Sequence, residues 1–396
     1  MTQSVIDPPS PAHTHGHGPV GPSSGRTRVI LAVALIPALL FTLAGLLSLW
    51  PDGADLPARV PAVVEGATNV DVTVIEEPSQ GTAVKVRLPG GEESTMSNPG
   101  ASVELHAGDE IVAVDVSEVS PMSPDPLVFM DHQRKAPIGW LAAAYAVVVL
   151  AVARWRGLAA LAGLGVAFLV FLGFTMPALL AGEAALGVAL VTSSLVMFAT
   201  LYLAHGLNAR TSAALLGTLF GLVLTAVIGS WAAGATYLGA SDHDAQYLLA
   251  TAPLTDLRGV ALCGLVLAGM GVLNDVTITQ ASAVWELRAV APGASRAMLF
   301  ARAMRIGRDH IASTVYTIAF AYVGGALPLL MMVWLVNQSP VMALTSGEIA
   351  EEVVRTLVGS IGLVLAIPIT TAIAALAVPG PGTDEAEIEA EPAPAG

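Results

Sequence analysis

Charged residues are scarce in this chain. Only 12% of its 396 residues are Asp, Glu, Lys or Arg, whereas 54% are hydrophobic. A soluble protein of this length normally has about twice that share of charge. Several apolar runs also approach or exceed the ~20 residues that a helix needs to cross ~30 Å of hydrocarbon. The composition therefore excludes an ordinary soluble protein and predicts one with several membrane-spanning helices.

Cysteine and positive charge are also in short supply. The single cysteine, Cys263, lies in an apolar run, so the chain can form neither an internal disulfide nor a cysteine metal centre. Its 17 Lys and Arg, against 31 Asp and Glu, form no basic stripe that could neutralise phosphates, which excludes nucleic acid as a partner.

Enzyme motifs are missing as well. The sequence has no phosphate-binding Gly-x-x-x-x-Gly-Lys loop, no His-Glu-x-x-His pair, and no Gly-x-Ser-x-Gly elbow between a strand and a helix. We therefore expect neither an enzyme nor a cofactor. Without a nucleotide site, any transport would have to be passive or driven by an ion gradient.

The two ends of the chain have the composition of disordered tails. Residues 1–25 are rich in Pro, Gly, Ser and His, and residues 378–396 are acidic. His13, His15 and His17 alternate in "HTHGHG", and three imidazoles can bind a divalent metal such as Zn²⁺, Ni²⁺ or Cu²⁺. The alternative is a low-complexity tail in which these histidines are incidental.

A first apolar segment covers residues 29–50, directly after Arg26 and Arg28. It is longer than the ~7–15 residues of a signal-peptide core, and no small-x-small cleavage site follows it. We interpret it as a retained signal-anchor transmembrane helix whose N-terminus lies in the cytoplasm.

Residues 51–136 change to a period of two. Valines alternate with polar residues in "VDVTVIEEP" and "AVKVRLP", and Gly90-Gly91 indicates a turn. The stretch "SVELHAGDEIVAVDV" predicts two further strands that are separated at Gly108-Asp109. About five or six short strands predict a small all-β external domain, a barrel or a sandwich. Such a domain could act as a gate, or dock a protein partner of the cell envelope.

Residues 138–377 predict a seven-helix membrane domain, which with the first segment makes about eight transmembrane helices. With both termini in the cytoplasm, ten of the 17 Lys and Arg fall on the cytoplasmic side, as the positive-inside rule requires. Most of the others lie in or beside the external domain. The predicted spans are 138–153, 158–180, 184–204, 211–233, 259–284, 311–336 and 353–377.

An acidic residue interrupts the fifth of these spans. The uninterrupted apolar run 259–273 is about 22 Å long as a helix, too short to cross the hydrocarbon alone. The helix must continue through Asn274 and Asp275, or break there within the protein, so Asp275 lies at membrane depth. Steps of three and four residues give this helix one small and polar row, which we expect to face the interior of the bundle. The row is Gly264, Ala268, Gly271, Asp275, Thr279, Ser282 and Glu286.

A second small and polar row follows and is a plausible facing surface. It aligns His310, Ser313, Thr317, Ala321, Gly324 and Pro328, and its Gly-Gly-x-x-Pro end could bend the helix. Arg308 and Asp309 stand where this span enters the membrane. They are expected to set topology and cap the helix, or to form a gating ion pair.

Two segments together resemble the signature region of the YibE/F-like integral membrane proteins. They are "GMGVLNDVTITQASAVWEL" and "IGRDHIASTVYTIAFAYVGGALPLLMM". The family pattern corresponds here to Asp275-Val276 and to Gly307-Arg308-Asp309, with Asn274 where small or apolar residues are also common. The resemblance implies a multi-pass protein of the bacterial plasma membrane, for which transport is the usual suggestion and no substrate is established.

Two functions remain open from the sequence. The first is a secondary transporter or exporter of a small solute or ion, with the intramembrane Asp275 as its proton- or cation-responsive group. The second is a membrane scaffold that does not transport, whose external domain docks an envelope partner and whose polar rows only hold the bundle together. The candidate residues for transport are Asn274, Asp275, Thr279, Ser282, Glu286, Arg308, Asp309 and His310.

Overall fold

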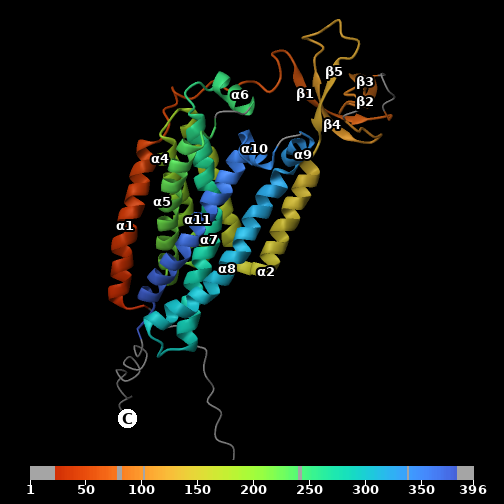
Figure 1. Ribbon diagram of the computed structural model, residues 1–396. Helices are drawn as coiled ribbons and strands as arrows, with labels where there is room; N and C mark the ends of the chain where they lie inside the picture. The colour runs from red at the N-terminus through yellow and green to blue at the C-terminus, as the bar shows by residue number, and fades with distance from the viewer. Residues whose placement is uncertain (1–22, 78–82, 101–102, 240–242, 337–338, 381–396) are drawn as a thin grey trace, which may run out of the picture. The chain divides into compact units, whose positions relative to one another are not determined.

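The computed structural model describes residues 23–77, 83–100, 103–239, 243–336 and 339–380. Two compact units share them. One is residues 58–158, and the other combines the chain up to Pro57 with the chain from Ala159 onward. Helices and strands carry the labels of Figure 1.

The smaller unit contains a closed five-stranded barrel with the strand order β1-β2-β3-β5-β4. Strands β3 and β5 are parallel, and the other pairs are antiparallel. This is the strand order of the OB-fold, a five-stranded Greek-key barrel. The strands are β1 (Thr68–Val74), β2 (Val84–Arg87), β3 (Glu93–Ser97), β4 (Glu110–Asp115) and β5 (Leu127–His132).

The barrel core follows from the alternation seen in the sequence. Every second residue points inward, so Val72 and Val74 of β1 and Val84 and Val86 of β2 are buried together. Met96, Ile111 and Leu127 complete this core and are almost fully buried. The prediction of a small β-domain is therefore confirmed, and of the two architectures left open the barrel is the one that forms.

One predicted strand does not form. The segment "SVELHA" before Gly108 has no strand in its described residues, although Leu105 is buried against the barrel. The barrel closes without it, because β1 pairs with β2 on one side and with β4 on the other. Gly108, with a φ of 97°, then turns the chain into β4.

Helix α2 (Lys135–Val170) contains a sharp break. Arg154 has a φ of 54° and a ψ of −129° and separates two helical segments. A Cβ atom on Gly157 would lie 2.6 Å from the carbonyl oxygen of Val149. A straight helix would hold residues eight apart at about 12 Å, so the chain bends back here, between the predicted spans 138–153 and 158–180.

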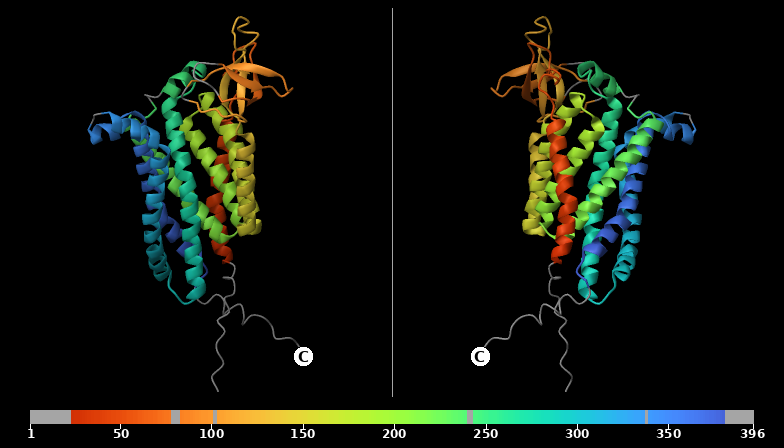
Figure 2. Two further views of the ribbon diagram at one scale, coloured as in Figure 1. Left: turned by 90° about the vertical axis from the view of Figure 1, so that its right-hand side faces the viewer. Right: turned by 90° about the vertical axis from the view of Figure 1, so that its left-hand side faces the viewer.

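The larger unit is a bundle of long helices that run alongside one another (Figures 1 and 2). Six helical segments of the described chain are long and apolar enough to cross a membrane, or seven if the bent pair α8–α9 counts as one span. The expected eight would require Lys135–Leu180, one of the six, to count as two segments divided at Arg154. After α2 the bundle contains η1 (Phe171–Thr175), α3 (Met176–Leu180), α4 (Ala185–His205), α5 (Ala209–Ala235), α6 (His243–Thr251), α7 (Leu257–Val290), α8 (Arg296–Gly325), α9 (Leu327–Leu335), α10 (Pro340–Leu344) and α11 (Gly347–Ala377), while α1 (Gly25–Ser48) precedes the barrel.

Helices α5, α7 and α11 form the tightest contact of the bundle. A side chain on Gly217 of α5 would overlap Thr370 of α11, and one on Gly362 of α11 would overlap Thr225 of α5. Between α5 and α7, the hydroxyls of Thr218 and Thr277 share a hydrogen bond of 2.6 Å and are fully buried. Small residues and interhelical hydroxyl bonds are what hold helices together in lipid.

Helix α8 begins earlier than the sequence indicated. Its N-cap is Ser295, whose hydroxyl accepts the backbone N–H of Met298 at 3.2 Å. Arg308 and Asp309 therefore lie inside the helix, and their interpretation as a helix cap is wrong. The apolar run starts only at Ile311, because arginines interrupt the first part of the helix. The predicted bend is confirmed: α8 and α9 meet at 66°, next to Pro328.

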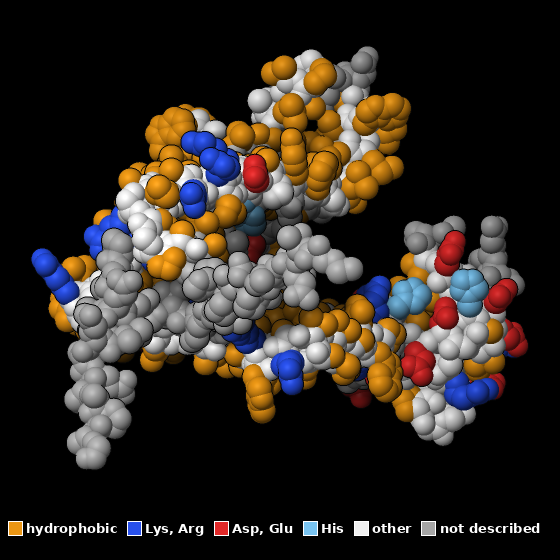
Figure 3. All heavy atoms as spheres, turned by 90° about the horizontal axis from the view of Figure 1, so that it is seen from below, with side chains coloured by type: hydrophobic (Ala, Val, Ile, Leu, Met, Phe, Trp, Pro, Cys, Tyr) orange, Lys and Arg blue, Asp and Glu red, His pale blue; other side chains and the backbone are white. Residues whose placement is uncertain are grey.

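Large hydrophobic side chains remain exposed along the outer helices. Phe41 of α1, Phe320 of α8 and Trp334 of α9 are 76%, 73% and 84% exposed. Figure 3 shows hydrophobic side chains over much of the visible bundle, while Asp and Glu side chains gather on the barrel. Apolar helix flanks of this kind suit contact with lipid rather than with water.

Candidate functional site

Helix α7 continues without a break through Asn274 and Asp275. It has 34 residues, more than the ~20 that cross a bilayer. Whichever ~20 consecutive residues of Leu257–Val290 lie in the hydrocarbon, they include residues 271–276. If α7 crosses the membrane, Asp275 is therefore inside it at any position of the helix along the membrane normal.

The polar row of α7 faces outward from the bundle. Gly271, Asp275, Thr279 and Glu286 are exposed, and Ser282 is half-buried. We expected this row to face the bundle interior, but the structure places most of it on the outside of the bundle. Other faces of α7 are buried against α4, α5 and α11, because larger apolar side chains there fill the contacts.

Asp275 has no hydrogen bond or ion pair to any other described residue. A carboxylate that faced lipid would cost about 2.5–3.5 kcal/mol on insertion scales. Protonation, a bound cation or local water removes that cost. The free-energy cost of an unpaired acid at this depth thus depends on what occupies the space beside it.

Apolar side chains, not the polar rows, form the contact between α7 and α8. Val276 of α7, Ile318 of α8 and Ile367 of α11 belong to one buried cluster, with Val272 and Ile311 at its edge. Nearer the connection between the helices, the Nε2 atom of Gln280 donates to the backbone oxygen of Ala303 at 2.8 Å. The two polar rows therefore do not face each other.

Both rows hold the same position relative to this shared cluster, which puts them on one side of the α7–α8 pair if Val276 and Ile318 each point toward the partner helix. Asp275 precedes the contact residue Val276 by one position, and Thr317 precedes Ile318 by one position. In antiparallel helices that face each other, equal steps along the sequence turn toward the same side. Ser313 and Thr317 are exposed, like Asp275 and Thr279. We call this surface the open face; its residues are Asp275, Thr279, Ser282, His310, Ser313 and Thr317.

The register of the hairpin brings Asp275 level with His310. Gln280 of α7 lies opposite Ala303, to which it donates, and beside Gly307. Because α7 and α8 are antiparallel, five residues back from Gln280 correspond to residues 308–312 on α8. His310 is half-buried, and its Nε2 atom is buried without a hydrogen-bond partner. The open face thus places a carboxylate and an imidazole at the same depth.

Hydroxyl oxygens extend the open face along α8. Ser313 donates to the carbonyl of His310 at 3.0 Å, and Thr317 donates to that of Ser313 at 3.0 Å. Their protons are directed into the helix, so the oxygens remain available as acceptors. Carboxylate and hydroxyl oxygens can bind a proton, a hydrated cation or a polar solute. Among the described residues no group of three His, Cys, Asp or Glu could hold a metal ion.

The other predicted site residues lie elsewhere. Asn274 points to a different face of α7, where its Oδ1 atom is buried without a partner. Arg308 and Asp309 are exposed and form no ion pair with a described residue. Glu286 lies at the edge of a separate pocket. The predicted metal ligands His13, His15 and His17 lie outside the described residues.

Sequence reasoning missed that separate pocket. It has a volume of about 1100 Å³ and lies between α1, α4, the start of α5 and the end of α7. Its polar lining includes Arg28, Tyr202, Asn208, Arg210, Ser212 and Glu286. The available signal was polar side chains within or beside apolar spans, but the sequence alone does not show that α1, α4, α5 and α7 meet here.

The comparisons assign the family. A family model described as "YibE/F-like protein" matches residues 141–380, more than half of the chain, so the chain belongs to this family, as its two signature segments indicated. The match covers α7, α8 and α11 but not the barrel. Comparisons with curated proteins and with solved structures found no match. The family and the apolar helices together support a membrane protein.

Proposed function

We propose that this member of the YibE/F-like family is a secondary transporter or exporter of a small solute or ion in the bacterial plasma membrane. In this proposal both termini are cytoplasmic and the barrel is external. The solute pathway follows the open face of α7 and α8. Asp275 is the group that binds and releases a proton or cation, with His310 at a similar depth on α8.

One observation carries the proposal. Asp275 is unpaired among the described residues and lies on the part of α7 that any membrane-spanning position includes. A purely structural acid would be expected to have a hydrogen-bond or ion-pair partner on a packed face. Thr277, two residues away, shows that pattern, with a buried partner in Thr218. Asp275 shows the opposite pattern, which is typical of a group that exchanges its partner.

Cells with and without the protein provide the first test. Metabolites and metal ions are compared without a target list at two external pH values, for wild type, Asp275→Asn and the control Glu286→Gln. We expect one class of solute to change in amount with wild type and with Glu286→Gln, but not with Asp275→Asn at equal abundance in the membrane. If Asp275→Asn behaves as wild type for every solute that changes, the role of Asp275 is wrong.

A chemical test reports on the carboxyl group itself. Hydrophobic carbodiimides react with protonated carboxyl groups within membranes. We expect mass spectrometry to find the adduct on Asp275, with more of it at low pH and less when the transported solute or cation is present. Exposed Glu286 is the internal control. Equal modification of both groups at every pH would contradict a special role of Asp275.

The barrel favours the second candidate, a scaffold that docks an envelope partner. It has its own hydrophobic core, and residues 51–136 carry fifteen acids against five bases. Arg134 donates to Asp131 at 2.7 Å and lowers the pKa of that carboxyl group. Such a surface suits a basic partner.

Replacing residues 58–133 by a Gly-Ser linker separates the two candidates. If the protein is a transporter and the barrel serves only for docking, the linker variant keeps solute flux. If the protein is a scaffold, the linker variant loses its partner, and neither it nor wild type shows solute flux. Recovery of the same partner with and without the barrel would contradict docking through this domain.

A further inference from the structure

The pocket beside α1 exists because α1 and α4 separate along their length. At one end they are in close contact: a Cβ atom on Gly45 would lie 2.6 Å from Val191, and one on Gly187 would lie 3.0 Å from Leu49. Toward the N-terminus of α1 the helices part and leave the pocket of about 1100 Å³. Its walls come from Leu31 to Leu39 on α1 and from Leu195 to Tyr202 on α4.

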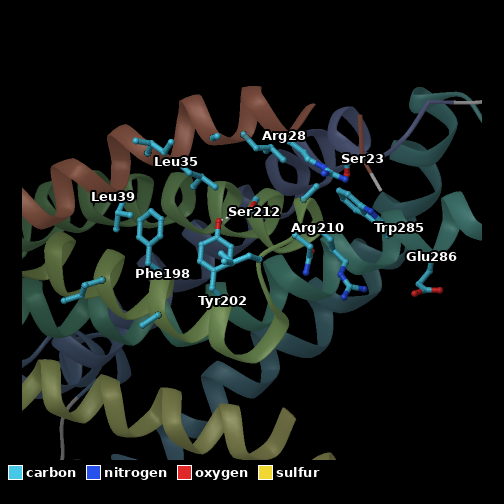
Figure 4. A pocket seen from close by; sticks show the side chains of 18 residues that line it. Ser23, Arg28, Leu35, Leu39, Phe198, Tyr202, Arg210, Ser212, Trp285 and Glu286 are labelled. Atoms are coloured by element: carbon cyan, nitrogen blue, oxygen red, sulfur yellow. Dashed lines mark hydrogen bonds between the residues drawn. The ribbon is translucent and has the colours of Figure 1, made fainter. Parts of the chain in front are cut away.

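Most of this pocket is apolar. Leu31, Leu35 and Leu39 line it from α1, and Phe198 lines it from α4 (Figure 4). From Leu31 to Leu39 the α1 wall is about 12 Å long. Half of the ~30 Å hydrocarbon core is about 15 Å. The apolar wall thus has the depth of one leaflet.

Positive and polar groups lie at the other end of the pocket. Figure 4 shows Arg28, Arg210 and Trp285 at the end away from Leu39. Neither guanidinium has a hydrogen bond or ion pair within the described chain. The Glu286 carboxylate also lines the pocket but lies apart from both arginines in this view. Tyr202 and Ser212 share a hydrogen bond of 3.0 Å at this end.

We infer that this pocket is a binding site for an anionic phospholipid of the cytoplasmic leaflet. The arginines bind the phosphate, since guanidinium groups match phosphate oxygens with paired hydrogen bonds. An acyl chain fills the apolar wall. Basic pockets between membrane helices on the cytoplasmic side are typical sites for anionic head groups, and Trp285 suits the interface between head group and hydrocarbon. A free phosphate would leave the long apolar part without a ligand. The choice of leaflet rests on the orientation proposed above, but the inference does not depend on transport.

The first test measures lipid binding to the purified full-length protein in detergent. The protein is titrated with phosphatidylglycerol, with phosphatidylcholine of the same acyl chains, and with inorganic phosphate, and the bound lipid is counted by native mass spectrometry. We expect phosphatidylglycerol to bind most tightly. Arg28→Gln with Arg210→Gln should weaken it about 30-fold, at about 1 kcal/mol for each lost charge, and each single substitution about fivefold.

The matched control removes two arginines outside the pocket. Arg302→Gln with Arg305→Gln takes the same charge from exposed positions on α8 and should leave phosphatidylglycerol binding unchanged. Equal losses in the two double variants would mean a general charge effect and would overturn the site. The single variants keep the test valid if a double variant does not fold.

A separate experiment tests the apolar part of the pocket, which we propose binds the acyl chain. Ala199 lines the pocket and is half-buried, so Ala199→Phe should fill it and weaken both phospholipids while the melting temperature is kept. Inorganic phosphate at the lipid's concentration should not displace phosphatidylglycerol. If it does, and Ala199→Phe has no effect, the pocket binds a soluble anion and the lipid assignment is wrong.

Discussion

Polar side chains on two faces of one helix, α7, have opposite surroundings. Thr277 is fully buried and bonded to Thr218 of α5 at 2.6 Å, and α5 in turn packs against α11 through Gly217. Asp275, two residues earlier, is exposed and has no partner among the described residues. Polarity in a membrane helix therefore does not by itself indicate function. Whether the group has a buried partner separates packing contacts from residues available to a ligand.

The largest effect should come from filling the packed face. Gly217→Leu would drive a side chain into Thr370, and we expect a loss of about 3 kcal/mol in the free energy of unfolding, measured by unfolding in detergent. The control is Gly271→Leu on the exposed polar row of α7, where no atom lies within 4 Å of a built Cβ. A similar loss in both variants would show that the two faces do not differ in packing.

Water access should differ sharply between the faces. In a Cys263→Ala background, a cysteine introduced by Thr279→Cys should react quickly with a water-soluble maleimide, and one introduced by Thr277→Cys should not. Thr279 is exposed, whereas Thr277 is fully buried. Equal labelling rates would remove the distinction on which the open face depends.

Loss of the buried hydroxyl pair should have a moderate effect. Thr277→Val keeps the shape but removes the bond to Thr218, and we expect about 1 kcal/mol of destabilisation, as for interhelical bonds in other membrane proteins. Thr279→Val should change stability by less than about 0.5 kcal/mol. Equal free energies of unfolding for Thr277→Val and Thr279→Val would contradict the difference between the two faces of α7.

The smallest change in stability should follow Asp275→Asn. No contact with a described residue is lost and the charge is removed, so the free energy of unfolding should stay within about 0.5 kcal/mol of wild type. Unfolding curves of the two proteins measure this directly. A destabilisation larger than that of Thr277→Val would make Asp275 part of the packing and contradict its proposed role.

The sequence predicted the polar row of α7 but not its direction. Steps of three and four residues identify Asp275, Thr279 and Ser282 as one face, and the 15-residue apolar run shows that the helix must continue past them. The direction depends on which helices pack against α7. That choice is made in part by Thr218 and Gly221 on α5, which contact Thr277 and Leu273 of α7 but lie far from them in the sequence.

The same limit explains the other differences. The start of α8 was missed because arginines hide an apolar period, although Ser295 is an ordinary N-cap. The alternating valines of β1, β2 and β4 predicted the strands of the β-domain, since the alternation of apolar and polar residues is recognisable even in short strands. Whether "SVELHA" joins the sheet is decided by the closure of the barrel, which only the three-dimensional pairing reveals.

Closure of the barrel also limits how a partner could recognise it. Each of the five strands pairs with a neighbour on both sides, so none of them offers a wholly unpaired side to which an extended peptide could add a strand. A bound protein must contact mainly loops and side chains instead. Recognition of this kind depends on charge and shape, and it protects the domain from edge-to-edge aggregation.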